Sequence, residues 1–300
     1  MENKNKSTII LFILFAFSIT ACSRGGGTPS SAKAITAFSL SSPAAMGIIN
    51  EVNHTIVVTV PFKTDVSTLV PTITHKGASI NPAPGVAQNF TRPVTYTVTA
   101  ADNSTQAYTV TVYRRFTDDF NRADSASVGN GWNELDGLDG SAVTLTGNMA
   151  RLTSGSNGGA STMVYNAVFS GDCSIVMTVN FASPSSYRLQ LVLLPAVANP
   201  TTQNYVMLLF GGRAYIYKDY SVMASSDLLS GMTTGRDYLI TFTKVSAILT
   251  IIAKDKASEA EVSASYTDSA PYNDFTGISL RNNMVNSETV TIDDFTIQSP

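Results

Sequence analysis

Apolar and polar residues alternate along most of the chain after residue 34. The clearest run spans residues 94–113, VTYTVTAADNSTQAYTVTVY, where Asp102, Asn103 and Ser104 interrupt the alternation. A period of two predicts strands buried on one face, and the interruption predicts a hairpin whose threonines face solvent. Residues 33–114 contain about seven such short strands and no helical period, which predicts an immunoglobulin (Ig)-like β-sandwich.

The same β pattern continues through residues 115–300. Twelve strand candidates alternate with Gly, Asn, Ser and Pro turns, which predicts a jelly roll of two packed sheets. Gly211-Gly212 separates two of them and predicts a hairpin turn of the primed type. The candidates are 142–146, 149–153, 161–165, 173–181, 187–194, 205–210, 213–218, 238–243, 248–254, 261–266, 276–280 and 289–297.

The first 32 residues follow a different pattern. Lys4 and Lys6 precede an apolar stretch, residues 9–19, that is too short to span a bilayer as a helix. Residues 1–21 therefore read as a signal peptide. Residues 22–32, which include SRGGGTPSS, predict a flexible tether because Gly and Ser bury no core.

The end of the signal peptide reads Ile19-Thr20-Ala21-Cys22. This sequence resembles the lipobox of bacterial lipoproteins. The resemblance implies cleavage before Cys22 and attachment of acyl chains such as palmitate, which anchor the protein in the cell envelope. Ser23 fits export to the outer membrane. The alternative is an ordinary signal peptide followed by an incidental cysteine.

Composition and charge exclude several classes of function. The net charge of −3 leaves no electrostatic footprint for nucleic acid. Two cysteines and two histidines cannot supply a disulfide framework or a Cys-based zinc site. If Cys22 is acylated, Cys173 is left alone in an apolar strand and is predicted to be a buried, inert thiol.

Both predicted β units resemble known families. ITAFSL, TIVVTVPFKTDVSTLVPTITHKGASI and PVTYTVTAADNSTQAYTVTV, within residues 33–114, resemble a cadherin-like sandwich family of bacterial surface lipoproteins. DDFNRADSASVGNGW, GISLRNN and VTIDDFTI, within residues 115–300, are similar to concanavalin A-like, laminin-G-like domains. The first resemblance implies a spacer module. The second implies a fold that serves glycan-binding modules, adhesive modules and some glycosidases.

One segment of the second unit is a catalytic candidate. Glu134, Asp136 and Asp139 loosely resemble the E-x-D-x-x-E signature of laminarinase-type hydrolases on this fold. Asp139 is one methylene short, and Gly137 suggests a turn rather than a strand. Trp132 is the single tryptophan, whereas hydrolytic clefts stack several sugars on aromatic rings. We therefore assign no catalytic residue and expect a polar loop here.

Acidic residues at the two ends of the second unit are a metal candidate. Residues 115–300 hold 11 Lys and Arg against 18 Asp and Glu, a formal charge of −7. Asp118 and Asp119 open this unit, and Asp293 and Asp294 close it. The first and last strands are neighbours in the expected fold, so the two pairs predict a structural Ca²⁺ site. The alternative is a set of solvated carboxylates that protect a strand edge.

Tyrosines and arginines in the middle of the second unit are a ligand-binding candidate. Exposed tyrosine beside arginine can stack on sugars and hydrogen-bond to them. The alternative is that the rings pack the sandwich core, which periodicity does not exclude. The candidate residues are Tyr187, Arg188, Tyr205, Arg213, Tyr215 and Tyr217.

Together these patterns predict a membrane-anchored surface lipoprotein, held through Cys22, with an all-β fold. Its terminal jelly roll is expected to bind a glycan or another extracellular ligand without catalysis. A structural or adhesive lipoprotein that binds another protein is the alternative, and a glycoside hydrolase is the third hypothesis. A competition experiment distinguishes the first two hypotheses, because free sugar abolishes glycan binding but not binding to another protein.

Overall fold

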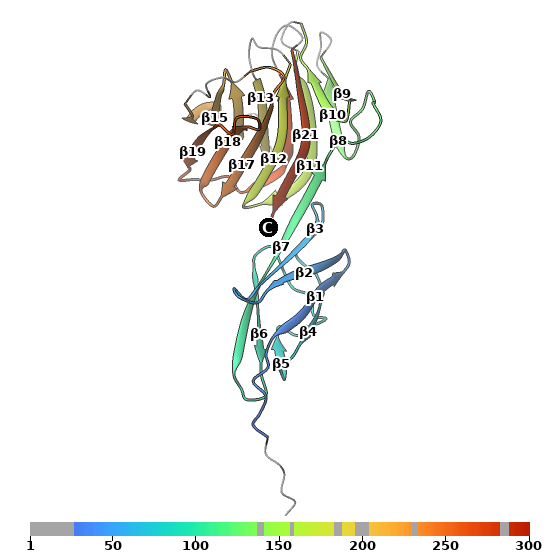
Figure 1. Ribbon diagram of the computed structural model, residues 1–300, viewed down its shortest axis with the longest axis vertical. Helices are drawn as coiled ribbons and strands as arrows, with labels where there is room; N and C mark the ends of the chain where they lie inside the picture. The colour runs from blue at the N-terminus through green and yellow to red at the C-terminus, as the bar shows by residue number, and fades with distance from the viewer. Residues whose placement is uncertain are drawn as a thin grey trace, which may run out of the picture.

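The protein is described here from a computed structural model, which covers residues 27–136, 141–156, 159–182, 188–195, 204–227, 229, 233–282 and 288–300. The described residues form strands and no helix, so the all-β prediction is confirmed. They build two units, one following the other along the long axis of the molecule (Figure 1). Nothing in the described part of the chain is a helix long and apolar enough to cross a bilayer. Cys22 lies outside the described residues.

The first unit is a β-sandwich with its own core. Its core consists of aliphatic and aromatic side chains that point inward from opposing strands. Among them, Phe38, Tyr96 and Val110 are at most 1% exposed. The 94–113 hairpin forms as predicted, with Tyr96 opposite Tyr108 in the antiparallel register. The unit contains β1 (Ile35–Ser41), β2 (Ala44–Asn50), β3 (Thr55–Pro61), β4 (Pro71–His75), β5 (Ser79–Asn81), β6 (Val94–Thr99) and most of β7 (Thr105–Asp118).

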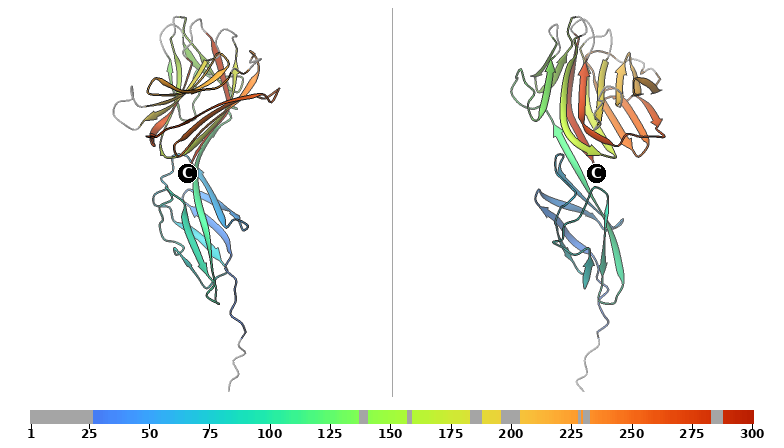
Figure 2. Two further views of the ribbon diagram at one scale, coloured as in Figure 1. Left: turned by 90° about the vertical axis from the view of Figure 1, so that its left-hand side faces the viewer. Right: turned by 180° about the vertical axis from the view of Figure 1, so that it is seen from behind.

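The second unit is the expected jelly roll of two packed sheets, seen edge-on in Figure 2. Alternate residues of both sheets point inward and form one large core. The seven-stranded sheet runs β16 (Ser221–Ser225), β15 (Arg213–Lys218), β14 (Tyr205–Phe210), β13 (Arg188–Pro195), β20 (Asp274–Asn282), β11 (Ser161–Ser170) and β8 (Trp132–Asp136). The opposing sheet contains β19 (Glu261–Thr267), β18 (Ile248–Asp255), β17 (Asp237–Val245), β12 (Cys173–Phe181), β21 (Thr289–Ser299), β10 (Met149–Thr153) and β9 (Ala142–Thr146).

Most strands of the second unit lie where the sequence predicts them. The predicted bounds of β9, β10, β12, β14 and β15 agree with the observed ones. Gly211 and Gly212 have φ angles of 58° and 75°, which is the conformation that the primed turn requires. Strands β8 and β16 were not predicted. Cys173 is buried as expected, and burial raises the pKa of its thiol to about 12.

Strand β7 connects the two units without a break. Its first part pairs with β6 and, in parallel, with β3. Its last residues, Arg114–Asp118, pair with β21, so one strand lies in both units (Figure 1). The predicted boundary between residues 114 and 115 therefore falls inside a strand rather than in a linker.

Phe62 adds a side-chain contact to this connection. It directly follows β3 of the first unit but belongs to the core of the second. Its ring packs edge-on against Tyr165 and Phe169, at centroid distances of 6.2 and 5.5 Å. The guanidinium of Arg114 covers the ring at 5.9 Å. Apolar packing and a continuous strand thus both resist bending between the units.

Replacing Phe62 with alanine tests this connection. Because the buried ring would leave a cavity, we expect Phe62→Ala to lower the free energy of unfolding by about 3 kcal/mol. Differential scanning calorimetry should then show the two units melting further apart in temperature. Val86→Ala is the control, since that side chain is 51% exposed in the first unit. Identical melting of the two variants would contradict a coupling role for Phe62.

Candidate functional site

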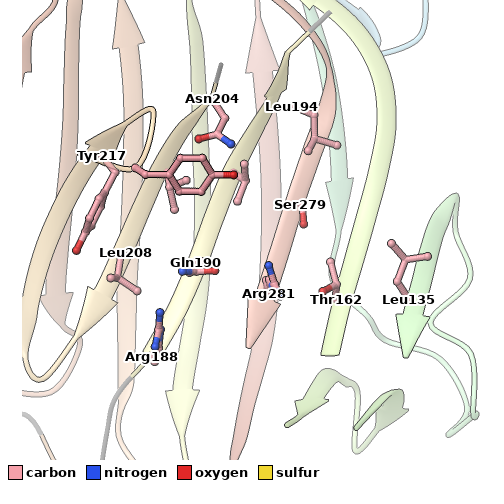
Figure 3. Close-up of a pocket in the computed structure, with 13 residues that line it drawn as sticks. Leu135, Thr162, Arg188, Gln190, Leu194, Asn204, Leu208, Tyr217, Ser279 and Arg281 are labelled. Carbon is pink, nitrogen blue, oxygen red and sulfur yellow. The ribbon is translucent and has the colours of Figure 1, made fainter. Parts of the chain in front are cut away.

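The outward face of the seven-stranded sheet is hollowed into a groove of about 680 Å³. A second hollow of about 730 Å³ shares four residues with it and continues over β11 to β8. Figure 3 shows side chains from β15 to β8 standing along this groove. The lining residues are Leu135, Thr162, Arg188, Gln190, Val192, Leu194, Asn204, Val206, Leu208, Tyr217, Tyr220, Ser279 and Arg281.

Strand register arranges the lining in rows across the sheet. Gln190 of β13 lies opposite Arg281 of β20 on one side and Leu208 of β14 on the other. A second row runs Tyr217, Val206, Val192, Ser279. With strands roughly 4.8 Å apart, this second row spans about 14 Å, so the groove suits an extended ligand rather than a single small ring.

Aromatic side chains gather at the β15 end of the groove. Tyr220 is 69% exposed, and Tyr217 is half-buried. Tyr215 lies on the same face as Tyr217, with ring centroids 6.2 Å apart. Phe210 on the neighbouring strand is 40% exposed. Aromatic rings that stay accessible beside a hollow provide flat apolar surface for a ligand.

Two buried polar atoms in the groove lack a hydrogen-bond partner among the described residues. They are Nε of Arg188 and Oδ1 of Asn204. Buried polar atoms in folded proteins are nearly always paired, so each unpaired atom requires an explanation. Both residues line the groove, so its wall contains polar side chains whose hydrogen-bonding capacity the described residues do not fully use.

The structure brings four of the six predicted ligand residues to this face. Arg188 and Tyr217 line the groove directly. Tyr215 and Arg213 lie beside it on β15, and Arg213 donates a hydrogen bond to the Ser226 carbonyl at 2.8 Å. Tyr187 lies outside the described residues.

Tyr205 was wrongly predicted to bind ligand. Alternation along β14 turns its ring into the core, where it is fully buried. Its hydroxyl donates to the Asp268 carboxylate and accepts from the Tyr272 backbone N–H. Burial, followed by the bond to Asp268, raises the pKa of Tyr205. Lys218 completes the group with a 2.7 Å ion pair to Asp268.

This buried network supports one end of the groove. Tyr272 donates from its hydroxyl to Asp219 at 2.6 Å, and Asp219 accepts from the backbone N–H of Asn204 at 3.1 Å. Asp219 and Tyr220 form the turn between β15 and β16. The network therefore fixes the backbone that carries Asn204 and Tyr220.

The catalytic candidate lies on a strand, not in the predicted loop. Glu134 is in the edge strand β8, opposite the buried Met163. Its carboxylate accepts hydrogen bonds from the backbone N–H of Val128 at 2.6 Å and the hydroxyl of Ser127 at 3.2 Å. Glu134 thus holds the preceding loop in place. Asp139 and the side chain of Asp136 lie outside what the structure describes.

The acidic pairs are neighbours, but Asp118 has other partners. Strand pairing sets Asp118 opposite Phe295, so the first and last strands of the unit do meet. Asp118 is buried and forms a 2.7 Å ion pair with Arg122 and a 3.0 Å bond from Trp132 Nε1. Burial raises the pKa of Asp118, but these bonds and one from the Phe120 N–H outweigh it and hold that pKa below its usual value.

Asp293 is partly buried close to two other acidic residues, Asp294 and Asp119. Burial raises the pKa of Asp293, and the charges of Asp294 and Asp119 add to the effect. Within the described ranges, no group of three or more His, Cys, Asp or Glu is placed to hold a metal ion. Calcium bound by Asp118, Asp119, Asp293 and Asp294 stays a prediction.

Several groove residues were missed at the sequence level. They are the polar lining residues Thr162, Gln190, Asn204, Ser279 and Arg281. The available signal was a pair of polar residues at alternate positions of an apolar strand, Arg188 and Gln190 in RLQLVLL and Ser279 and Arg281 in GISLRNN. Periodicity alone does not tell an outward groove from an ordinary solvated face.

Comparison with known proteins gives one family match, in the first unit. A family model described as "SGBP, N-terminal", where SGBP denotes surface glycan-binding protein, matches residues 35–112. This range is about a quarter of the chain. No curated protein matches the sequence.

Several solved structures resemble the chain at low sequence identity. One is lectin I-B4 from Griffonia simplicifolia in its metal-free form, with TM-score 0.47 and 11% identity over 62% of this chain and 99% of that chain. Arcelin-5, a lectin-like defense protein from Phaseolus vulgaris, has TM-score 0.45 and 13% identity over 63% and 98%. A Bacillus subtilis protein of unknown function with a galectin-like fold has TM-score 0.45 and 10% identity over 61% and 94%.

The Asp118 interactions predict a specific pH dependence of stability. A carboxyl whose pKa is depressed on folding stabilises the fold above its unfolded pKa, near 3.8, and loses that contribution as the pH falls. We expect Asp118→Asn to lower the free energy of unfolding by about 2 kcal/mol at pH 7 and by less at pH 3.

Urea denaturation of both proteins at the two pH values measures this difference. Asp119→Asn is the matched control, because Asp119 is exposed and should change stability little. An equal loss for Asp118→Asn at pH 7 and pH 3 would show that the ionised form of Asp118 is not what stabilises the fold.

Proposed function

We propose that this protein is a surface lipoprotein that binds a glycan in the groove of its second unit, without catalysis. The observation that carries the proposal is the groove itself, an extended hollow that combines accessible tyrosines with unpaired buried polar atoms. The similarity of residues 35–112 to the N-terminal part of surface glycan-binding proteins supports it.

The chemistry of the lining suits a carbohydrate. Sugar rings offer apolar C–H faces surrounded by hydroxyls, so a site needs flat apolar surface with hydrogen-bonding groups around it. Tyr217 and Tyr220 supply the flat surface at one end. Gln190, Asn204 and Arg281 supply donors and acceptors along the floor and sides.

The same lining supports binding rather than hydrolysis. Glycosidases position two carboxyl groups on either side of the scissile bond, about 5–10 Å apart. The described residues that line the groove include no Asp or Glu. In the adjoining hollow Glu134 is present, but its carboxylate is committed to the backbone of Val128 and to Ser127.

We further propose that residues 1–21 are removed and that acylated Cys22 anchors the chain to the outer membrane. Residues 22–32 form the tether, residues 33–114 the spacer, and residues 115–300 the binding unit. Strand β7 and Phe62 join spacer and binding unit firmly, so the groove would be held at a set distance from the first unit.

A protein-binding role is the second candidate, because the first unit exposes apolar side chains. Met46 and Ile48, on one face of β2, are 79% and 75% exposed. Val52, just after β2, is 89% exposed. Such a group fits a contact with another protein. Competition by free sugar distinguishes the two roles, since only glycan binding in the groove would be displaced.

A glycan array with the purified protein, followed by calorimetric titration of each hit, tests glycan binding. We expect Tyr217→Ala and Tyr220→Ala each to weaken binding by about ten-fold or more, because each removes an aromatic face of the site. Met46→Ala is the control, since it truncates an exposed apolar side chain outside the groove. Absence of any glycan bound by the wild-type protein would refute the proposal.

Metabolic labelling with palmitate tests the anchor. In a bacterial host, Cys22→Ala should abolish labelling and move the protein from the membrane to the soluble fraction, because no other residue receives the acyl chains. Cys173→Ala is the matched control and should keep the label, since that thiol is buried. Labelling of Cys22→Ala would contradict the assignment.

A further inference from the structure

We propose that the groove selects an anionic glycan, whose sugars carry carboxylate or sulfate groups that bind Arg188 and Arg281. This inference rests on the proposed glycan-binding function and specifies the class of glycan. It is carried by a cluster of arginines that form no ion pair with any acidic residue the structure describes, on a unit that is otherwise strongly acidic.

The arginines are brought together by strand register. Arg281 lies opposite Gln190, and Arg188 is two residues before Gln190 on the same face of β13. The two arginines are therefore diagonal neighbours, with Cα atoms roughly 7–8 Å apart. Arg213 lies in the same row as Arg188, with Phe210 between them. Figure 3 shows Arg188, Gln190 and Arg281 beside one another.

None of these arginines forms an ion pair within the described part of the chain. The ion pairs found there involve Arg122, Lys218, Arg236 and Lys254. Arg213 bonds a neutral carbonyl, and Arg188 lies 5.7 Å from the centre of the Phe210 ring. The Nε of Arg188 is buried without a partner. A guanidinium in a partly buried site, such as that of Arg188, usually pairs with a carboxylate or phosphate, so an acceptor is missing there.

Two acidic residues at the ends of the groove, Asp219 and Glu134, have other partners. Asp219 is held by Asn204 and Tyr272 at the turn that closes β15. Glu134 lies on edge strand β8, where it binds the preceding loop. The described groove lining contains arginine as its only charged residue type.

The arginine cluster contrasts with the negative charge of the second unit. With a formal charge of −7, residues 115–300 repel an anionic polymer at long range. Positive charges collected in one groove, repelling one another without an ion pair to a described residue, are costly without a ligand and favourable with an anionic one. A neutral sugar would accept hydrogen bonds from the same groups but would not relieve this repulsion.

Paired acidic and neutral glycans test the inference on the full chain purified in detergent. The probes are polygalacturonate against its methyl ester, and dextran sulfate against dextran. The neutral panel is xylan, β-glucan, mannan and starch. We expect binding to one acidic probe at least ten-fold tighter than to its neutralised partner, and weaker binding as salt increases. The first pair reports a carboxylate ligand and the second a sulfate.

Arginine variants locate the binding. Arg281→Gln and Arg188→Gln should each weaken binding to the acidic probe by about ten-fold or more while leaving the melting temperature unchanged. Arg151→Gln is the matched control. It removes the same charge, but Arg151 is exposed on β10 of the opposite sheet.

Three outcomes overturn the inference, and they are distinguishable. Binding of neutral glycans with equal affinity, unaffected by Arg281→Gln, leaves the proposed function standing and removes the anionic selectivity. Failure to bind any glycan, acidic or neutral, removes both. Acidic binding that Arg151→Gln weakens as much as Arg281→Gln would be non-specific attraction and would also overturn the inference.

Discussion

The candidate site depends on the packing of one sheet against another. Each central strand of the seven-stranded sheet must bury every second side chain in the common core, and the remaining side chains are then left on the outer face. In β14 this rule buries Tyr205 and Met207 and presents Val206 and Leu208 outward. The groove is the product of this division, because its floor consists of the outward residues of consecutive strands.

The core also supports the groove from beneath. Tyr205, Lys218 and Asp268 form a buried polar network under β14 and β15, and Tyr272 and Asp219 extend it to the turn that carries Tyr220. Buried networks of this kind hold one geometry because each group that loses its partner is costly. This network therefore lies beneath the end of the groove that carries the accessible tyrosines.

Strand β7 and Phe62 give the two units a shared architecture. A strand that is hydrogen-bonded in both units cannot bend at their boundary without losing ladder bonds on one side. Phe62 packs in the core of the second unit, although it directly follows β3 of the first unit. A spacer joined in this way transmits position from the tether to the groove, which a flexible linker would not do.

The sequence by itself determined the all-β class, most strand positions and the hairpin turn at Gly211-Gly212. These depend on local alternation and on glycine at positive φ, and both can be read from neighbouring residues. Only the tertiary structure decided which tyrosines and acidic residues of the second unit turn inward. In the folded chain Tyr205 points into the core, and Arg188 lies beside Arg281. Asp118 forms an ion pair with Arg122 and a hydrogen bond with Trp132. Those outcomes depend on pairing between residues up to about a hundred positions apart, and no local pattern records such register.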